Sequence, residues 1–281
     1  MVVTGASSGI GLAIATALCA KGIDVIGVGR SPERCDQATA SIAAAVPGAG
    51  IAFEIADLSS QTQVRELAAR LRMRLGAAYS GQLAALINNA GAIANWYTAT
   101  EDGYELQFAL NHLATFLLTL ELLPNLASGA PARVVTVSSA SHRNTRIHWK
   151  DVMLRRNYNT LLAYKQSKLA NVMFTAEFNR RHAASGVRAY AADPGLVNTE
   201  IGMKGTSGIV AWFWDRRRRG GKSPEYGAAT AVHLATDPSV ASFPGIYWKD
   251  SRPKAPSAYA LREAEASRLW ELSERLCGIG E

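Results

Sequence analysis

The sequence predicts a doubly wound α/β fold: a parallel sheet of about seven strands with helices on both faces, in a single domain spanning 1–281. Apolar β-runs alternate with helical patterns along almost the whole chain, and no Pro/Gly-rich linker divides it. Continuous apolar strands separated by helices are typical of parallel sheets that are covered on both faces. A chain of 281 residues that is 48% hydrophobic can bury the core that such a sheet needs.

The expected strands lie near Val2–Thr4, Asp24–Val28, Ile51–Ile55, Leu83–Asn88, Arg133–Ser138, Val187–Ala191 and Gly245–Trp248. The first strand has only Met1, Val2 and Val3 before a glycine-rich turn. Because a central strand usually takes about five or six residues, either this strand is short or its start is trimmed.

Two serine-proline pairs predict helix starts. Ser31-Pro32 and Ser223-Pro224 each combine a good N-cap with a proline suited to the first turn. The last helix is expected to start at Ser257 and to end before Gly278, with an apolar stripe of Leu261, Leu269, Leu272 and Leu276.

The segment from Asp193 to Lys222 is the least regular part of the chain, and it follows the sixth strand, at the sheet edge where ligands of such folds bind. We interpret 196–222 as a substrate flap. An ordinary surface loop is the alternative, but the neighbouring aromatics Trp212, Phe213 and Trp214 would be unusual in a loop that covers nothing.

The formal net charge is +7, and the run Arg216–Arg219 contributes to it. Such a run is typical either of a patch for nucleic acid or anionic membranes, or of a solvated loop that attracts an anionic cofactor or substrate. Because no nucleic-acid-binding motif accompanies it, we favour the second interpretation and expect no nucleic-acid partner.

Cysteine usage and apolar runs indicate the compartment. Three cysteines, spaced like neither a metal site nor a redox pair, favour a reducing compartment, and we expect the cytoplasm. The longest apolar run, Phe116 to Leu123, is interrupted by Glu121 and too short for a membrane span, and the N-terminus has no basic region before an apolar one.

His142 and His148 have no further candidate metal ligands at suitable spacing, so we expect no metal and assign them to pocket lining or loop surface.

Two motifs point to chemistry. The turn Thr4-Gly5-Ala6-Ser7-Ser8-Gly9-Ile10-Gly11 lies between a β-run and an amphipathic segment, where backbone N–H groups and a helix N-terminus can receive a pyrophosphate. Its spacing differs from G-x-G-x-x-G, with three residues between Gly5 and Gly9. Tyr164 and Lys168 lie four apart in a helical pattern, so the phenol and the ammonium share a face.

Further motifs occur in order along the chain: Asp57-Leu58, Asn88-Asn89-Ala90-Gly91, Asn111, Ser138-Ser139 and, after the sixth strand, Pro194-Gly195. Together with the turn and the Tyr/Lys pair they resemble the short-chain dehydrogenase/reductase family over nearly the whole chain. The resemblance implies a Rossmann-like fold. It also implies that Tyr164 is the general acid/base, that Lys168 lowers the tyrosine pKa and binds the nicotinamide ribose, that Ser139 holds the carbonyl, and that Asn111 anchors a proton-relay water.

Elementary chemistry agrees with these roles. A phenol with a pKa near 10 is a poor base at neutral pH, so a cation one helical turn away must favour the phenolate. Hydride addition to a ketone builds negative charge on oxygen, which donors from Ser139 and Tyr164 would stabilise. Alone, the Tyr/Lys pair would more often be an ordinary helix pair, and only the accompanying motifs favour catalysis.

The resemblance also implies a dinucleotide site, and one arginine predicts which cofactor fills it. Arg30 follows the second strand, and no acid occurs until Glu33. A cation there accommodates a 2′-phosphate, which favours NADP(H) over NAD; a surface arginine is the alternative. The expected cofactor-binding residues are Gly5, Ser7, Ser8, Gly9, Ile10, Gly11, Arg30, Asp57, Leu58, Asn89, Ala90, Gly91, Tyr164, Lys168, Pro194, Gly195, Val197 and Thr199.

Further segments resemble the retinol-dehydrogenase-like branch: Val137-Ser-Ser-Ala-Ser-His142, a 24-residue insertion before Tyr164, Ser167-Lys-Leu-Ala-Asn171, Lys222-Ser-Pro-Glu225 and Arg268-Leu-Trp-x-Leu-Ser273. This branch implies an NADP-dependent carbonyl reductase or alcohol dehydrogenase for lipophilic substrates. We expect no N-terminal anchor of the kind that many members carry, and the flap departs from the pattern, so a bulky, aromatic or polycyclic ketone fits as well as a retinoid.

Two questions stay open at this level. A catalytically silent NADP-sensing protein on the same fold is the alternative function, although Asn111, Ser139, Tyr164 and Lys168 are all present. Helices expected from about Asp102 and Asn157 would form a dimer or tetramer interface in many relatives, but the branch includes monomers. Both a monomer and a homo-oligomer are therefore consistent with the sequence.

Overall fold

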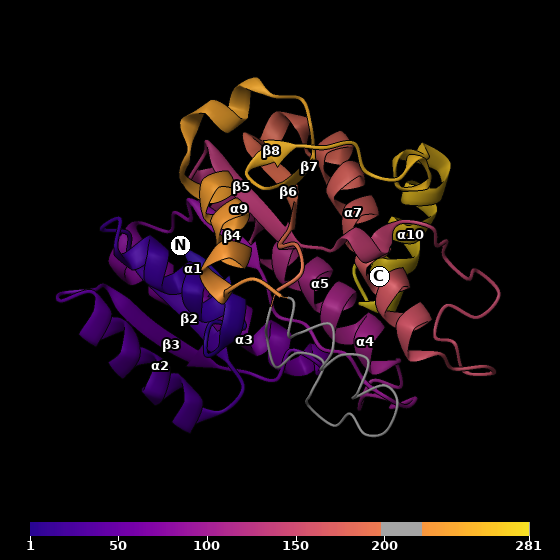
Figure 1. The fold of residues 1–281 in the computed structure, drawn as a ribbon, viewed down its shortest axis with the longest axis horizontal. Coiled ribbons are helices and arrows are strands. Elements are labelled where there is room, and N and C mark those ends of the chain that lie inside the picture. Colours follow the sequence, from indigo (N-terminus) through magenta and orange to yellow (C-terminus); the bar gives the residue numbers. More distant parts are fainter. Residues whose placement is uncertain (198–220, 281) are drawn as a thin grey trace.

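The computed structural model of the chain describes residues 1–197 and 221–280. Its centre is an eight-stranded sheet in the order β3-β2-β1-β4-β5-β6-β7-β8 (Figure 1). The strands β1 to β7 run parallel, and β8 pairs antiparallel with β7. Their bounds are β1 Val2–Thr4, β2 Val25–Gly29, β3 Ile51–Ile55, β4 Ala85–Asn88, β5 Ala132–Val137, β6 Val187–Asp193, β7 Tyr247–Lys249 and β8 Arg252–Pro253.

The predicted fold class and each of the seven expected strands are confirmed, with strand ends that differ by at most two residues. The eighth strand was not expected, because its two exposed residues, Arg252 and Pro253, carry no apolar pattern. The first strand spans Val2–Thr4 in the described residues.

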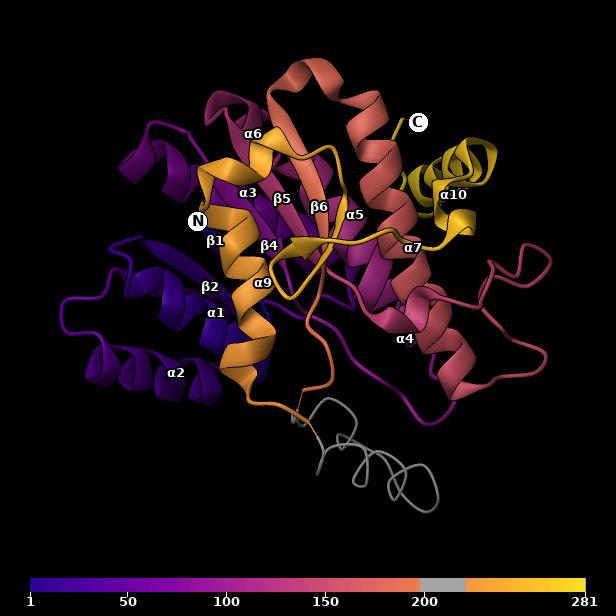
Figure 2. The ribbon, with the colours of Figure 1, turned by 45° about the horizontal axis from the view of Figure 1, so that its top comes forward.

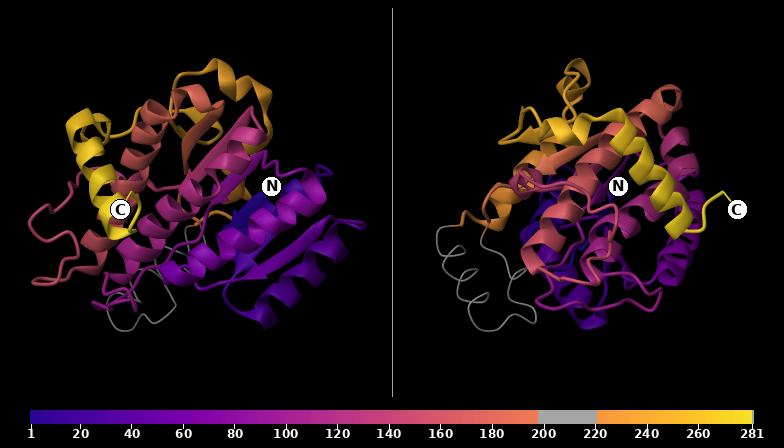
Figure 3. Two further views of the ribbon diagram at one scale, coloured as in Figure 1. Left: turned by 180° about the vertical axis from the view of Figure 1, so that it is seen from behind. Right: turned by 90° about the vertical axis from the view of Figure 1, so that its right-hand side faces the viewer.

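Helices cover both faces of the sheet. Their bounds are α1 Gly9–Cys19, α2 Pro32–Ala45, α3 Gln61–Tyr79, α4 Leu106–Phe108, α5 Ala114–Glu121, α6 Leu123–Ser128, α7 Thr160–Arg181, α9 Pro224–Thr236 and α10 Glu263–Leu276. The helices α1, α2 and α9 pack on one face, where α1 and α9 lie side by side (Figure 2). The helices α3, α5 and α7 pack on the other, with α10 outside α7 (Figure 3). None of these described helices combines the length and the apolar character that a membrane crossing requires.

Alternation along the central strands supplies both halves of the core. In β1, Val2 packs with the α3/α5/α7 side and Val3 with the α1/α9 side. Leu86 and Ile87 divide in the same way in β4. Because successive side chains of a strand point to opposite faces, strands that are apolar at every position fit only a sheet that is buried on both sides.

The serine caps are confirmed for two helices and wrong for the last. The Ser31 side chain accepts from Arg34 N at 3.3 Å and that of Ser223 from Tyr226 N at 3.4 Å. Ser257 instead caps a short turn, Ala258–Leu261, and α10 begins only at Glu263. Extended backbone at Arg262 separates the two, so Leu261 is 53% exposed rather than part of the apolar stripe.

The helices expected from about Asp102 and Asn157 begin slightly later. The first starts at Leu106 and contains a π-helical turn, Ala109–Leu113, before α5. The second, α7, starts at Thr160 behind Asn159, whose side chain accepts from Leu162 N at 2.9 Å. Both helices carry residues of the expected catalytic set.

Candidate active site

The glycine-rich turn between β1 and α1 folds tightly on itself. Gly5 and Gly9 have φ of +66° and +54°, which glycine adopts without steric cost. A Cβ on Gly11 would lie 2.0 Å from the Gly5 oxygen, and one on Gly5 would lie 3.0 Å from Ala90 Cα. The turn therefore needs glycine at these positions, and it leads into the N-terminus of α1 at Ser8, whose side chain makes no cap hydrogen bond.

Residues after β4 hold this turn in place. The Thr4 hydroxyl accepts from the backbone N–H groups of Asn89 and Ala90, both at 3.0 Å. In return, the Asn89 side-chain amide donates to the Thr4 oxygen at 2.9 Å and to the Gly5 oxygen at 3.4 Å. Since β1 lies between β2 and β4, these bonds join the two strand ends at the point where the strand order reverses, where ligands of such sheets bind. The Asn89 amide thus supports the turn.

Asn111 and Gly91 bring the next loop against α7. Asn111 lies in the π-helical turn, an irregularity frequent at functional sites. Its Oδ1 accepts from Ala92 N at 2.8 Å, while its Nδ2 donates to the Ala92 oxygen at 3.1 Å and to Ser167 Oγ at 2.9 Å. A Cβ on Gly91 would lie 3.1 Å from Asn111 Oδ1 and 3.6 Å from Lys168 Nζ. Three of the expected residues from three separate segments therefore meet here.

Lys168 is a buried cation beside Tyr164. Its side chain is 3% exposed, and its Nζ donates to the Val137 oxygen at 2.9 Å and lies 5.7 Å from the centre of the Tyr164 ring. Burial lowers the pKa of Lys168 from 10.5 to about 8. The Ser138 hydroxyl donates to the Lys168 backbone oxygen at 2.9 Å, so the end of β5 fixes this turn of α7.

Ser139 follows β5 and begins a short turn, Ala140–His142. Its Oγ accepts from Ser141 N at 3.1 Å, and its backbone oxygen accepts from His142 Nδ1 at 2.7 Å. His142 is fully buried, so the expectation that it lines a pocket or a loop surface is wrong. His148 is exposed, as expected, and its N–H donates to Gln166 Oε1 at 2.8 Å.

The residues expected at the adenosine end gather at the ends of β1, β2 and β3. The Arg30 side chain is 75% exposed, and its guanidinium lies 3.6 Å from Asp57 Oδ2. A Cβ on Gly29 would lie 3.2 Å from Ser7 Oγ, which places Ser7 beside the end of β2. Leu58 packs its side chain into the core, where it is 8% exposed.

The segment after β6 returns to the same edge of the sheet. Gly195 has φ of +74° and donates its N–H to Asp193 Oδ1 at 2.9 Å. The N–H of Lys222 donates to the Leu196 oxygen at 2.9 Å, which joins the two ends of the predicted flap. A Cβ on Gly227 would lie 2.6 Å from Val197 Cγ2 and 3.2 Å from Ile10 Cγ1, so the side chains of Val197 and Ile10 meet over α9. The expected Thr199, Trp212–Trp214 and Arg216–Arg219 lie outside the described residues.

The model of the short chain dehydrogenase family matches residues 1–208. The chain belongs to the short-chain dehydrogenase family. It is 37% identical to human retinol dehydrogenase 13 over 290 residues, which covers 99% of this chain and 84% of that protein. It is 36% identical to human retinol dehydrogenase 11 over 279 residues, which covers 99% of this chain and 86% of that protein. The chain is thus an oxidoreductase of the retinol-dehydrogenase-like branch, as its motifs predict.

Solved structures agree with the fold. A crystal structure of an uncharacterized protein from Mycobacterium paratuberculosis superposes with a TM-score of 0.78 at 32% identity and covers 99% of this chain and 92% of that one. An alcohol dehydrogenase from Thermococcus sibiricus, complexed with 5-hydroxy-NADP, has a TM-score of 0.66 at 20% identity over 90% of this chain and 98% of that one. At that identity the second likeness shows the fold alone.

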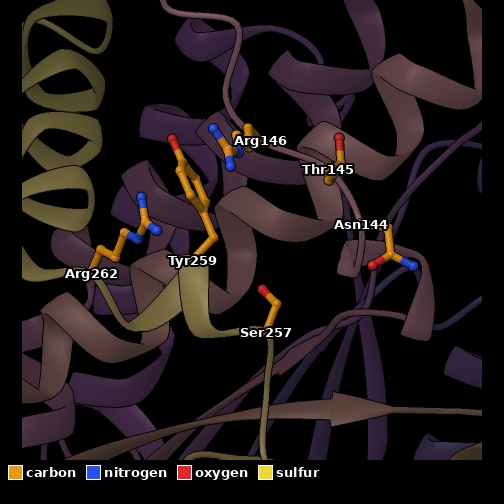
Figure 4. Close-up of a pocket in the computed structure, with 6 residues that line it drawn as sticks. All are labelled: Asn144, Thr145, Arg146, Ser257, Tyr259 and Arg262. Carbon is orange, nitrogen blue, oxygen red and sulfur yellow. The ribbon is translucent and has the colours of Figure 1, made fainter.

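A cavity of about 360 Å³ lies elsewhere on this short-chain dehydrogenase, between the segment after His142 and the turn before α10 (Figure 4). Two of its arginines, Arg146 and Arg262, lie 5.9 and 5.5 Å from the centre of the Tyr259 ring. None of the four expected catalytic residues lines this cavity, whose lining residues are Asn144, Thr145, Arg146, Ser257, Tyr259 and Arg262. Within the described residues, no group of three or more His, Cys, Asp or Glu is placed to hold a metal ion.

The short-chain dehydrogenase therefore brings together Gly91, Asn111, Tyr164 and Lys168, and it attaches Ser139 to the end of β5 beside them. The sequence reasoning named Asn89 as a cofactor contact and Thr4 as part of the turn, but it missed the bridge that they form between the strand ends. It also missed His142 as the partner of Ser139. The segment Val137–His142 drew attention to the histidine, but local spacing carries no signal for its burial.

Proposed function

We propose that the chain is an NADP(H)-dependent oxidoreductase that interconverts a ketone or aldehyde with an alcohol on a bulky lipophilic or polycyclic substrate. The observation that carries the proposal is the buried Lys168 ammonium, 5.7 Å from the centre of the Tyr164 ring and beside the Gly91 loop. A charge this deeply buried is costly, and an acid/base partner of Tyr164 supplies a reason for it.

The residues present fit a dinucleotide. The turn leaves no room for a side chain at Gly5 or Gly11, and Gly9 has a positive φ, so the backbone can approach a pyrophosphate at the N-terminus of α1. At the adenosine end, Arg30, Ser7 and Asp57 would contact the ribose and its substituents. The nicotinamide end would lie near Lys168, Tyr164 and Pro194-Gly195. The bound cofactor supplies the hydride to the carbonyl carbon, or accepts it in the reverse direction.

The side chains of the protein handle the proton. As the carbonyl oxygen gains negative charge, the hydroxyls of Ser139 and Tyr164 donate to it, and Tyr164 delivers the proton. The phenolate left behind is stabilised by Lys168. With a pKa of about 8, Lys168 is protonated roughly ten to one at pH 7, so it is charged when the phenolate forms and close to the pH at which it can pass a proton on.

Arg30 supports NADP(H) over NAD(H). It directly follows β2, and its side chain is 75% exposed. Its guanidinium is 3.6 Å from Asp57 Oδ2, too long for a tight hydrogen bond, so it is accessible to a ligand. A guanidinium at this position suits a 2′-phosphate, whereas a carboxylate would suit the 2′-hydroxyl of NAD.

The reaction is tested by following NADPH oxidation with a panel of bulky ketones. We expect Tyr164→Phe to lower kcat by about 10²–10⁴-fold and to weaken NADPH binding by no more than about tenfold, the loss of one hydrogen bond. Tyr79→Phe is the matched control. Tyr79 ends α3, and its hydroxyl donates to Asp24 Oδ2 at 3.2 Å rather than to any expected catalytic residue. We expect this variant to keep wild-type kcat. Equal rates for Tyr164→Phe and wild type would refute the mechanism, and NADPH binding without turnover of any ketone would favour the silent sensor.

Cofactor preference is tested separately with Arg30→Ala. We expect the ratio of kcat/KM for NADPH to that for NADH to fall about tenfold or more, since a charged hydrogen bond is worth about 1.5–3 kcal/mol. Lys21→Ala removes an exposed cation at the opposite end of the same strand-helix unit and should leave the ratio unchanged. An unchanged ratio in Arg30→Ala would remove Arg30 as the phosphate contact.

We also propose a role for segment 196–222 and a location for the protein. Segment 196–222 is proposed to cover the substrate, and the bond that joins its ends, Lys222 N to the Leu196 oxygen just before α9, supports this. A cytoplasmic location is supported by Cys19, Cys35 and Cys277, which are all free and buried.

A further inference from the structure

We propose that His142 is a positioning residue: its neutral imidazole, held between Ser139 and the segment 254–257, fixes the backbone of Ser139 and thereby aims the Ser139 hydroxyl. The proposal rests on the proposed function, in which Ser139 donates to the carbonyl oxygen. His142 is fully buried and contacts the backbone oxygen of Ser139, so it would act through the serine rather than on the substrate.

The hydrogen bonds of the His142 ring define its tautomer. Nδ1 lies 2.7 Å from the Ser139 carbonyl oxygen, which only accepts, so Nδ1 carries the proton. Nε2 lies 3.0 Å from the backbone nitrogen of Ser257, which only donates, so Nε2 is unprotonated. A protonated ring would set an N–H against the Ser257 N–H. The geometry therefore requires the neutral form, and burial lowers the pKa of His142 accordingly.

His142 holds Ser139 through two bonds to the same atom. The Ser139 carbonyl oxygen accepts from the backbone N–H of His142 at 3.1 Å and from its Nδ1 at 2.7 Å. On the other side, Ser139 Oγ accepts from Ser141 N at 3.1 Å, so the hydroxyl keeps its own proton to donate. Both ends of Ser139 are thus oriented by the short turn that His142 completes.

The segment 254–257, called the strap here, holds the imidazole from the far side. The strap is anchored at one end by Lys254 N, which donates to the Tyr247 oxygen at 2.8 Å, and in its middle by the Arg143 guanidinium, which donates to the Ala255 oxygen. Its last residue, Ser257, donates to His142 and also lines the cavity of Figure 4. The strap is 115 residues away in sequence, so no local preference supplies this contact.

The His142 ring also contacts Tyr247, which is hydrogen-bonded to Asp193 just before the Pro194-Gly195 loop. The rings of His142 and Tyr247 are 4.7 Å apart between centres. The Tyr247 hydroxyl donates to Asp193 Oδ2 at 2.7 Å, and Asp193 Oδ1 accepts from Gly195 N at 2.9 Å. The charged groups facing His142 are Asp193, through Tyr247, and Arg143, whose guanidinium lies 5.9 Å from the centre of the Tyr247 ring. His142 therefore packs between the serine loop and Tyr247, the residue whose hydroxyl contacts Asp193.

The first test is a double-mutant cycle on kcat. We expect His142→Phe to lower kcat by up to about 10²-fold, the cost of a small misplacement, with NADPH affinity within about twofold of wild type. In a Ser139→Ala background the same change should have little further effect, because residues that act as a unit are non-additive. His142→Asn, whose amide N–H can reach the Ser139 oxygen, should recover much of the loss. An unchanged kcat in His142→Phe, or an equal loss in both backgrounds, would overturn the proposal.

The strap is tested without altering His142. Ser257 has φ of −66°, which proline adopts, so Ser257→Pro removes the N–H donor with little backbone strain. We expect Ser257→Pro to lower kcat and Ser257→Ala, which loses only the hydroxyl, to retain it. Equal kcat for the two variants would refute the role of the strap.

A spectroscopic test needs no activity. In ¹⁵N-histidine-labelled protein without cofactor, the resonances that disappear in His142→Asn should show the Nδ1–H tautomer between pH 6 and 8, and an Nε2–H tautomer would overturn the assignment. Wild-type turnover that is lost in Ser139→Ala supports the proposed function on its own, so failure of the His142 proposal is separable from failure of that function.

Discussion

Replacing Lys168 with methionine should make the cofactor-free protein more stable at neutral pH while it abolishes turnover. Burial lowers the pKa of this lysine from 10.5 to about 8, and each unit corresponds to about 1.4 kcal/mol. Keeping the ammonium charged inside the protein at pH 7 therefore costs about 3 kcal/mol. Methionine removes this cost but leaves the Val137 oxygen without the Nζ donor, a loss of about 2 kcal/mol. The net gain is about 1 kcal/mol.

The pH dependence of this difference is a sharper measurement than its size. Between pH 8 and 10.5 the unfolded chain still binds the Lys168 proton and the folded protein has released it, so the wild type gains stability as pH rises. The gain across this window is about 3 kcal/mol, which the methionine variant lacks. Lys168→Met should thus be more stable than wild type below pH 8 and less stable near pH 10.5.

Chemical denaturation of both proteins at several pH values, without cofactor, measures this difference. Lys165→Met, on the same helix and only partly buried, should change stability by less than about 0.5 kcal/mol at every pH. A stability difference for Lys168→Met that stays constant from pH 7.5 to 10.5 would refute the argument that burial of the charge is the dominant cost.

Two further perturbations follow from buried groups and close contacts. His112 is buried, and burial lowers its pKa from 6.5 to about 4; stability should therefore fall by about 3 kcal/mol as pH drops from 6.5 to 4, and urea unfolding should show this fall in wild type but not in His112→Gln. Gly11→Ala should abolish measurable NADPH binding, because the new Cβ meets the Gly5 oxygen at 2.0 Å. The control is Gly76→Ala in α3, where a Cβ meets nothing within 4 Å; it should keep NADPH binding and raise stability by up to about 1 kcal/mol. NADPH fluorescence titration and thermal melts measure both variants. Equal NADPH affinity and equal stability in Gly11→Ala and Gly76→Ala would contradict the prediction.

What the sequence predicts well is what depends on short-range periodicity. The central strands are mostly apolar runs, and Tyr164 and Lys168 lie one helical turn apart wherever that helix packs. The caps at Ser31 and Ser223 likewise need only their own next three residues.

The rest depends on distant partners. His142 is polar and sits in a loop by its local pattern, but Ser257 and Tyr247 enclose it. Asn89 is typical of a turn, yet its amide is used by Thr4 and Gly5, 85 and 84 residues earlier. The wrong start of the last helix has a similar origin, since the strap around Ser257 is drawn toward His142 instead of continuing into α10.

The short strand β8 decides how one side of the sheet ends. The N–H of Lys254 points inward to the Tyr247 oxygen of β7, so by the two-residue alternation of a strand the outward donor position falls on Pro253. Proline has no N–H to offer there, and exposed Arg252 stands beside it. A second copy of the chain cannot continue the sheet through a regular ladder at this edge. Any self-association of the enzyme on this side must therefore use side-chain surfaces, and the apolar strands behind β8 are protected from edge-to-edge aggregation.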